Sequence, residues 1–325
     1  MNTLTASQLH NGGVVRLDDV LEVTLPELRD FVFKRVAEGL RIASLFVVQE
    51  AALASLYAVL ADDSFGALQV ARARIEGNSF ESLTPQCPQA HWFEREIAEQ
   101  YGIIPEGHPW LKPIRFHSSY RPGADAWGRP AGTHPTAGVT DFFKVAGDEV
   151  HEVAVGPVHA GVIEPGHFRF QCHGENVFHL EISLGYQHRG IEPALIGGPH
   201  KKSIFQIEAL AGDTTIGHTT AFCQAIEALS GCQVPARAHA VRAIALELER
   251  LANHTGDLGA LAGDTAFLPT ASYCGRIRGD FLNMTALICG NRFENRISGT
   301  NLGACMANGR ALGLVNDRQS PIAIG

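Results

Sequence analysis

The sequence predicts an α+β protein in which a small N-terminal α/β module is followed by a helical bundle capped by a β-hairpin. Three observations support this prediction. Helical and strand periods are mixed over about the first hundred residues, two alternating apolar/polar runs lie between residues 166 and 184, and three long helical periods follow. The 325 residues are enough for two domains.

The N-terminal module is predicted to hold two helices and several strands. A helical pattern opens at Leu25 and ends before Gly39, with Leu28 and Phe31 on one face, and a second helix is expected over residues 89–101. Strands are expected at residues 42–48, 68–75 and 80–83, whereas residues 53–60 fit either a strand or a helix.

Residues 156–192 combine turns with titratable side chains. Two alternating runs, 167–170 and 177–184, are bounded by Gly- and Pro-containing turns, which is typical of paired half-buried strands. Six of the fifteen histidines lie between His151 and His188, so a zinc or iron hydrolase site is one alternative. Their spacings of 8, 8, 6, 6 and 9 residues do not converge on one face, and no HxxxH or HExxH occurs, so this alternative is not favoured.

The second half of the chain is predicted to be helical after a linker. Residues 118–140 are rich in Gly, Pro, Ser and Thr, which is typical of a linker. Helical periods follow at residues 204–229, 236–262 and 270–287. The predicted domains are therefore 1–117 and 141–325, joined by 118–140.

Composition limits the partners and the compartment. A net charge of −8 argues against nucleic acid. No apolar run reaches the roughly 18 residues that span a bilayer, and the start of the chain has no signal-peptide pattern, so any membrane contact is expected through partners. The seven cysteines include no CxxC and are predicted to be reduced, mostly buried thiols in the cytoplasm.

Two hairpin segments, GPVHAGVIEPGHFRF (156–170) and LGYQHRGIE (184–192), resemble the N-terminal β-region of group 4 nickel–iron hydrogenase large subunits. These are the membrane-bound enzymes of the hydrogenase-4 and formate hydrogenlyase type. More loosely, both segments resemble the 49 kDa subunit of respiratory complex I. The segment ELERLANHTGDLG (247–259) is also similar to the large-subunit pattern, and its Glu247, Glu249 and Arg250 are expected to form ion pairs on the helix surface.

A third block, HWFEREIAEQYGI (91–103) followed by PEGHPWLKPIRF (105–116), resembles the 30 kDa subunit of complex I. The order implies fused 30 kDa-like and 49 kDa-like modules, with the resemblance covering roughly residues 85–325 and the end of the bundle missing. For the run Glu94 to Glu96 it implies docking against neighbouring subunits. A charge run of this kind is otherwise typical of a solvated helix face.

The resemblance also implies that the nickel ligands are lost. When His218, Ala221, Phe222 and Glu227 are aligned with the family pattern, the first two ligand cysteines fall on Ala211 and Thr214, which supply no thiolate. The second cysteine pair would lie in a longer chain. This chain alone is therefore expected to bind no cofactor. An iron–sulfur cluster is expected in a partner subunit, and quinone is a candidate ligand of the old metal cavity.

The resemblance assigns roles to six titratable residues: Glu164 to proton relay, His167 and Asp213 to the inherited cavity, His167 and His218 to a quinone-like ligand, and His188 and Arg189 to orientation.

Structural alternatives exist for several of these residues. Glu164 would cap a turn, Asp213 would be the N-cap of the following helix, and His188 with Arg189 would bond backbone carbonyls. No tyrosine stands near Gly212, where the complex I pattern has its quinone-contacting tyrosine.

The implied function is that of a large-subunit-like component of a membrane-associated respiratory oxidoreductase complex, coupling electron transfer to proton or ion movement. The implied partners are a small iron–sulfur subunit and antiporter-like membrane subunits on the cytoplasmic face of the membrane. The alternative is a non-catalytic structural or assembly subunit, or a truncated remnant of one. Missing helices would leave apolar surface exposed unless a partner covers it.

Overall fold

The computed structural model describes residues 7–50, 53–130, 132–133, 135–136, 138, 141–158, 165–200 and 202–289. It divides into two compact units, and the boundary falls between His188 and Arg189. The strands of the first unit are β1 Ser7–His10, β2 Leu21–Val23, β3 Arg41–Glu50, β4 Leu53–Asp62, β5 Ala67–Ile75, β6 Ser79–Glu81, β7 Ile104–Glu106, β8 Val150–Val158, β9 Gly166–His173 and β10 Asn176–Ser183. The helices of both units are α1 Leu25–Ala37, α2 His91–Tyr101, α3 Ile191–Leu195, α4 Ser203–Glu208, α5 Thr215–Ser230, α6 Ala236–Asp264 and α7 Leu268–Cys289, with short 3₁₀ turns at Leu17–Asp19 and Pro88–Ala90.

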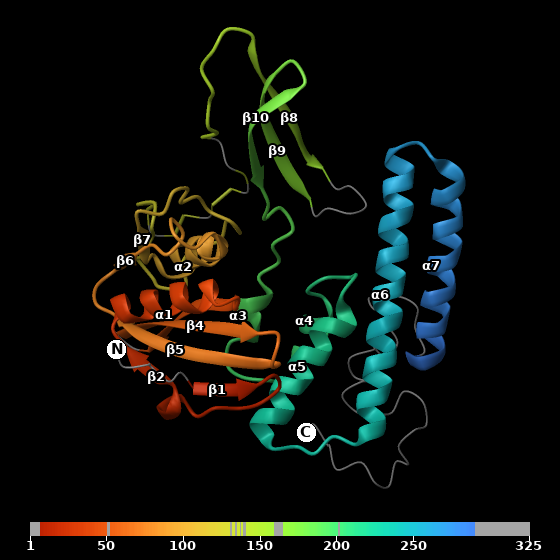
Figure 1. Cartoon of the computed structure of the whole chain (residues 1–325), viewed down its shortest axis with the longest axis horizontal. Coiled ribbons are helices and arrows are strands. Elements are labelled where there is room, and N and C mark those ends of the chain that lie inside the picture. Colours follow the sequence, from red (N-terminus) through yellow and green to blue (C-terminus); the bar gives the residue numbers. More distant parts are fainter. Residues whose placement is uncertain are drawn as a thin grey trace. The chain divides into compact units, whose positions relative to one another are not determined.

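The N-terminal module is a mixed sheet covered by helices, as the sequence predicts (Figure 1). The strand order is β1-β5-β4-β3, and β2 pairs in parallel with β5. Helix α1 begins at a capping box, in which Thr24 and Glu27 satisfy each other's backbone and side-chain groups. Residues 53–60, which fitted either a strand or a helix, lie in β4. Its residues Ala54, Leu56, Ala58 and Leu60 face the main core, and Tyr57 and Val59 pack on the other side of the sheet. The main core lies between this sheet and the helices α1 and α2.

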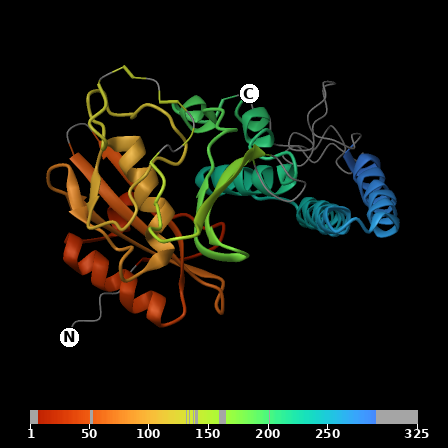
Figure 2. The same ribbon diagram turned by 90° about the horizontal axis from the view of Figure 1, so that it is seen from above.

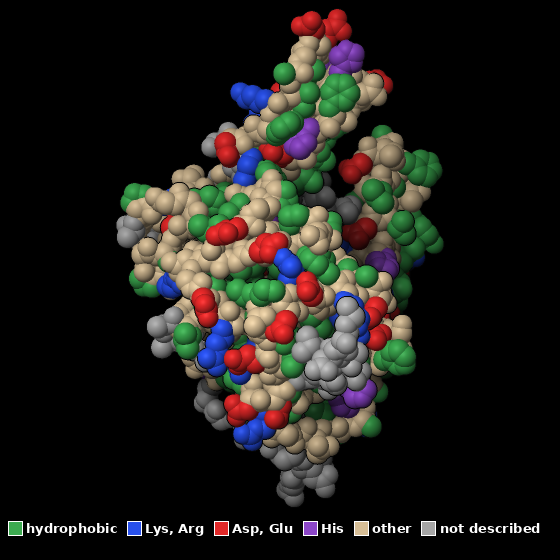
Figure 3. All heavy atoms as spheres, turned by 60° about the vertical axis from the view of Figure 1, so that its left-hand side comes forward, with side chains coloured by type: hydrophobic (Ala, Val, Ile, Leu, Met, Phe, Trp, Pro, Cys, Tyr) green, Lys and Arg blue, Asp and Glu red, His purple; other side chains and the backbone are tan. Residues whose placement is uncertain are grey.

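The three-stranded sheet β8–β9–β10 confirms the predicted hairpin and adds a third strand. The strand order is β10-β9-β8, and all pairs are antiparallel. Gly156 permits the close crossing of β8 and β9, because its φ is +96° and a Cβ there would lie 2.3 Å from the Gly166 carbonyl oxygen. Hydrophobic side chains are exposed on this sheet, at the top of Figure 3; the exposed ones include Val153, Val155, Val177, Phe178 and Leu180.

The second unit is helical. The helix predicted over 204–229 is broken into α4 and α5, and this part of the prediction was wrong. The break covers residues 209–214, where a Gly-Asp pair favours a turn over a helix. Helices α6 and α7 confirm the other two predictions and run side by side as an antiparallel pair (Figure 1 and Figure 2).

Residues 118–130, the first part of the predicted linker, contact the N-terminal module. The Ser119 hydroxyl donates to the carbonyl of Gln100 at 3.0 Å. Gly102, with φ +64°, ends α2 and lies against Ala124, where a Cβ would come within 2.8 Å of backbone. The predicted domain boundaries stay predictions, but this segment is held to α2 rather than free of it.

Candidate functional site

Helix α2 buries three charged side chains, although its charge run was predicted to be solvated or to dock neighbouring subunits. Glu94, Arg95 and Glu99 are 0%, 2% and 1% exposed. The Glu94 carboxylate accepts hydrogen bonds from the hydroxyls of Ser82 and Thr84, each at 2.6 Å, and from the backbone N–H of Leu83 at 2.6 Å. The solvated-face interpretation was therefore wrong for Glu94 and Arg95, because these groups exchange water for local hydrogen bonds.

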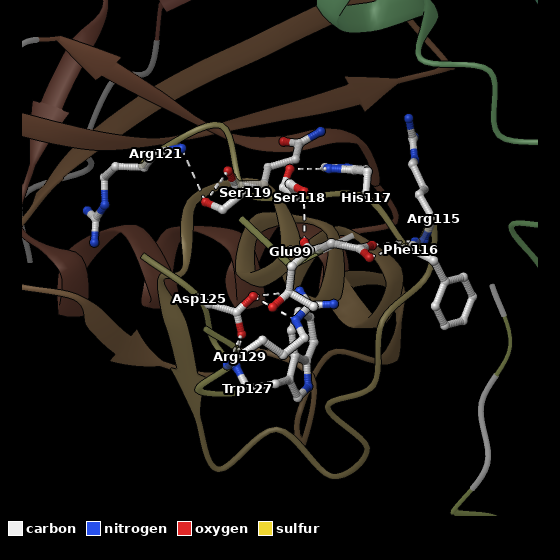
Figure 4. Close-up of polar contacts among 12 residues, drawn as sticks. Glu99, Arg115, Phe116, His117, Ser118, Ser119, Arg121, Asp125, Trp127 and Arg129 are labelled. Atoms are coloured by element: carbon white, nitrogen blue, oxygen red, sulfur yellow. Dashed lines mark hydrogen bonds and ion pairs between the residues drawn. The ribbon is translucent and has the colours of Figure 1, made fainter. Parts of the chain in front are cut away.

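Glu99 organises the segment that follows the module. Its carboxylate accepts three consecutive backbone N–H groups, from Ile114 at 3.0 Å, Arg115 at 2.8 Å and Phe116 at 2.7 Å. Figure 4 shows the carboxylate turned toward this backbone, with the further turn at Asp125 beside it. A buried carboxylate that accepts several N–H groups fixes a loop as firmly as regular structure does.

Arg95 lies between two indole rings. Its guanidinium carbon is 4.7 Å from the ring centre of Trp92 and 4.5 Å from that of Trp110. It also donates to the carbonyls of Lys112 at 2.7 Å and Pro113 at 3.0 Å. Burial lowers the pKa of Arg95 to about 10, so the side chain stays charged at neutral pH.

The histidines beside Arg95 are held neutral. Burial, followed by the charges of Arg95 and His108, lowers the pKa of His91 to about 4. The pKa of His108 is lowered too, chiefly by burial. His108 accepts from the backbone N–H of Trp110 at Nδ1 and lies 3.2 Å from the His91 carbonyl at Nε2. These rings are packing elements at neutral pH.

The segment held by Arg95 and Glu99, residues 112–116, also reaches the hairpin sheet. Lys112 Nζ lies 3.5 Å from the Glu181 carboxylate of β10, and Glu181, 4% exposed, accepts the backbone N–H of Phe143 at 3.2 Å. Trp110, Lys112 and residues 141–143 line an open groove of about 510 Å³ along β10. The α2 network and the hairpin sheet are thus connected by ionic and hydrogen-bonding contacts within one unit.

His167 is the predicted site residue with the most defined environment. It is 9% exposed, its Nδ1 lies 3.1 Å from the Gly156 carbonyl oxygen, and its Nε2 lies 3.2 Å from Arg169 Nε. The ring of Phe142 lies at 5.2 Å. Both ring nitrogens are engaged, so in this arrangement His167 offers no N–H to the carbonyl oxygen of a quinone.

The other predicted residues of the hairpin region differ in how far they are described. Glu164, the predicted proton relay, lies outside the described residues. His188 stacks on His117 with ring centres 5.2 Å apart, and His117 stacks in turn on Tyr120 at 5.0 Å. His188 therefore belongs to a stack of rings at the end of the organised segment.

In the helical unit, Asp213 is not the helix N-cap, and that alternative was wrong. The N-cap position is Thr214, without a side-chain cap, and the Asp213 side chain is 77% exposed, 3.5 Å from Arg278 of α7. Glu249 of α6 takes the capping role, since its two carboxylate oxygens accept the N–H groups of Ile216 at 2.8 Å and Gly217 at 3.1 Å. Of the predicted surface ion pairs, Arg250–Glu247 is confirmed at 3.2 Å.

Arg189 and His218 also lie in the helical unit. Arg189 donates to the carbonyls of Ala209 and Leu210, at 2.7 Å for the second, which is the structural alternative for this residue. His218 is half-buried on α5, one turn after Thr214. The five predicted residues that the structure describes therefore divide between two units: His167 and His188 belong to the first, and Arg189, Asp213 and His218 to the second.

The described donors on α5 do not fit a thiolate-bound metal. The cysteine on this helix, Cys223, is 5% exposed, and burial raises the pKa of its thiol to about 11. Its neighbours Glu227 and Arg242 pair with each other through two hydrogen bonds, at 2.9 Å and 2.5 Å. Ala211 and Thr214 supply no thiolate.

Comparisons with known proteins cover both halves of the chain. The family of the respiratory-chain NADH dehydrogenase 30 Kd subunit matches residues 22–127. Formate hydrogenlyase subunit 5 of Escherichia coli (strain K12) is 32% identical over an alignment of 286 residues that covers 82% of this chain and 49% of that protein. The chain is a group 4 hydrogenase-type subunit with a complex I 30 kDa domain.

Further relatives of this group 4 hydrogenase-type subunit point the same way. Hydrogenase-4 component G of Escherichia coli (strain K12) is 32% identical over 69% of the chain and 42% of that protein. The NADH-quinone oxidoreductase C/D protein of Bdellovibrio bacteriovorus is 29% identical over 70% of the chain and 42% of that protein. The chain spans about half of the curated relatives it matches, or less. Within its described part, no helix is both long and apolar enough to cross a bilayer.

Sequence reasoning missed the structural roles of several residues of this hydrogenase-type subunit. They are the buried carboxylates of α2, the cap Glu249, the pair Glu227–Arg242 and the neighbours of His167. A cap supplied from another helix leaves no local pattern, because Glu249 and Ile216 are 33 residues apart. Glu99 leaves no local pattern either, because the N–H groups that it accepts lie 15 to 17 residues further along the chain.

Proposed function

We propose that the chain is a large-subunit-like component of a membrane-associated respiratory oxidoreductase complex of the hydrogenase-4, formate hydrogenlyase or NADH-quinone oxidoreductase type. It takes part in coupling electron transfer to proton or ion movement. The observation that carries this proposal is the similarity to formate hydrogenlyase subunit 5 over 82% of the chain, which extends beyond the 30 kDa-like module.

The chain does this without a nickel–iron centre of its own. Support comes from Ala211 and Thr214 at the positions of two ligands, and from the buried, protonated thiol of Cys223. The iron–sulfur cluster that carries electrons belongs to a partner subunit. A quinone contact through His167 is not favoured, since both nitrogens of that ring are engaged within the sheet.

The proposed roles of the individual residues follow the family pattern. Glu164 relays protons, while His167, Asp213 and His218 belong to the inherited cavity and His188 and Arg189 orient its edge. The partners are a small iron–sulfur subunit and antiporter-like membrane subunits. Through them the chain lies at the cytoplasmic face of the membrane.

A mild-detergent pull-down of the tagged chain from its own host tests this function. Recovery of a small iron–sulfur protein together with antiporter-like membrane proteins is expected. Metal analysis of the purified chain is expected to find no stoichiometric nickel. Recovery of the chain alone or only with chaperones would contradict the function, and one nickel per chain would contradict the absence of a centre.

The relay is tested in the recovered complex by Glu164→Gln. We expect loss of turnover with assembly intact, because the amide cannot carry a proton. Glu175→Gln is the matched control, since Glu175 is an exposed carboxylate in the turn of the same hairpin. Unchanged turnover in the Glu164 variant would eliminate the relay.

A structural or assembly subunit is the second candidate. The observation that favours it is the engagement of the predicted residues: His167 by Gly156 and Arg169, Asp213 by Arg278, and Arg189 by backbone carbonyls. Under this candidate the complex assembles with the chain and fails without it, but substitutions at all of these residues leave turnover unchanged.

A further inference from the structure

The hydrogen bonds of His167 select one tautomer. A carbonyl oxygen only accepts, so the 3.1 Å contact to Gly156 requires a hydrogen on Nδ1. A guanidinium only donates, so the 3.2 Å contact from Arg169 Nε requires a lone pair on Nε2. The imidazole is therefore neutral, with its hydrogen on Nδ1 and its Nε2 lone pair covered by a cation.

Arg169 is itself held from two sides. Its Nη1 is bonded to the Glu152 carboxylate of β8, and its guanidinium carbon lies 4.3 Å from the ring centre of Phe142. Glu152 also accepts from Gln171 Nε2 at 2.9 Å, and the bonds from Gln171 and Arg169 keep the pKa of Glu152 below its usual range. The guanidinium of Arg169 therefore has an anionic partner, Glu152, in addition to its hydrogen bond to His167.

Further charged groups lie near His167, Arg169 and Glu152. Glu181 of β10 stands opposite Arg169 in the sheet register and is engaged by Lys112 and Phe143. Lys144 adds a positive charge near Glu152. The residue opposite His167 on β10 is the neutral Ser183. Among the described residues, Arg169 is thus the group that donates to the Nε2 lone pair of His167.

We infer that Arg169, anchored on Glu152, is a positioning residue that keeps His167 in the Nδ1–H tautomer and controls access to its Nε2. This inference rests on the proposed function insofar as His167 belongs to the cavity. For Nε2 to take up a proton, the Arg169 Nε–H···Nε2 bond must break while an N–H bond forms on the ring. Arg169 then remains bonded to Glu152, so the exchange leaves its guanidinium paired.

The tautomer is measured on the full chain with ¹⁵N-labelled histidine, using imidazole nitrogen shifts assigned by His167→Gln. The native chain is expected to show His167 in the Nδ1–H form. Arg169→Gln is expected to weaken this selection, with part of the population appearing in the Nε2–H form, because the Gly156 carbonyl is then the remaining group that favours a hydrogen on Nδ1. Arg41→Gln is the matched control, since Arg41 forms a comparable ion pair with Asp63 elsewhere in the same unit.

A native chain in the Nε2–H form, or an unchanged tautomer in Arg169→Gln, would overturn the inference. If Arg169→Gln does not fold, Glu152→Gln tests the same point, because a loosened Arg169 predicts a partial loss of selection. The result is independent of the pull-down. Absence of partner subunits would overturn the proposed function while leaving the tautomer measurement decisive for Arg169.

Discussion

Helix α2 buries charged side chains, whereas helices α6 and α7 expose apolar ones. Glu94 and Glu99 of α2 are at most 1% exposed, while Leu258 and Leu261 of α6 are 60% and 55% exposed. The carboxylates are stable inside because backbone N–H groups and hydroxyls replace their water. The leucines lie on α6, which within the described part of the chain packs chiefly against α7. A side chain is buried where partner groups are available to it, and the partners of Glu94 and Glu99 lie in the same unit as α2.

The largest effect is expected from Glu99→Ala. The substitution leaves the N–H groups of Ile114, Arg115 and Phe116 without their buried acceptor. With about 1–3 kcal/mol for each unsatisfied group, partly relieved by water, we expect a loss of about 3–5 kcal/mol in the free energy of unfolding. Urea denaturation measures it. Glu38→Gln, at the exposed end of α1, is the control and should change stability by less than about 0.5 kcal/mol. A loss equal to the control's would mean that the segment is fixed by other contacts.

Acidification is expected to weaken the same module. The folded chain holds His91 neutral with a pKa of about 4, against about 6.5 in the unfolded chain. Between these values the unfolded state binds more protons, so stability is full above about pH 6.5 and falls as the pH drops toward 4. Because the ring is only half-buried, we expect about 1–2 kcal/mol over this range.

Urea midpoints measured from pH 8 to pH 4.5 give this slope, and His91→Asn is expected to flatten it. The exposed His10→Asn should leave the slope as it is in the native chain. Carboxylates of the fold contribute equally in all three proteins, so the difference isolates His91. Equal slopes in the native chain and the His91 variant would contradict a buried neutral ring.

The elements were largely predictable from periodicity, because α1, β3, β9 and α6 obey one period over their length and have clear boundaries. The break between α4 and α5 was not predictable from that period, since the apolar pattern continues across it. The burial of Glu94 and Arg95 was not predictable either, because their partners come from residues 82–84 and 112–113. Sequence spacing does not report contacts of this kind.

The candidate site was less accessible from the sequence. The family relationship is confirmed, and the role that it assigns to His167 stays a prediction. It does not report that Arg169 and Gly156 engage both ring nitrogens. The roles of the site residues stay predictions. Asp213 illustrates the reason: its place before a helix suggests a cap, but a carboxylate from α6 already occupies the N–H groups it would need.

A smaller effect is expected from Glu249→Gln on the cap of α5. The amide keeps one acceptor but loses the charge that complements the helix N-terminus, so we expect a loss of about 1 kcal/mol. Hydrogen exchange should be faster at the amides of Ile216 and Gly217, about fivefold for that free energy. Glu247→Gln is the control, because Glu247 lies two residues away on the same helix and forms an exposed ion pair. Equal exchange in both variants would show that Glu249 does not cap the helix.

The smallest effect on stability is expected from the double substitution Leu258→Gln with Leu261→Gln. Both side chains are more than half exposed, so the free energy of unfolding should change by no more than about 0.5 kcal/mol. The same change at Leu28, which is 1% exposed in α1, should cost about 3 kcal/mol or more. Recovery of partner subunits in the pull-down should fall for the double variant, because an exposed apolar face of this kind is typical of an interface. If instead the double variant unfolds as readily as Leu28→Gln, the leucines of α6 are buried in the folded chain, and the contrast with α2 disappears.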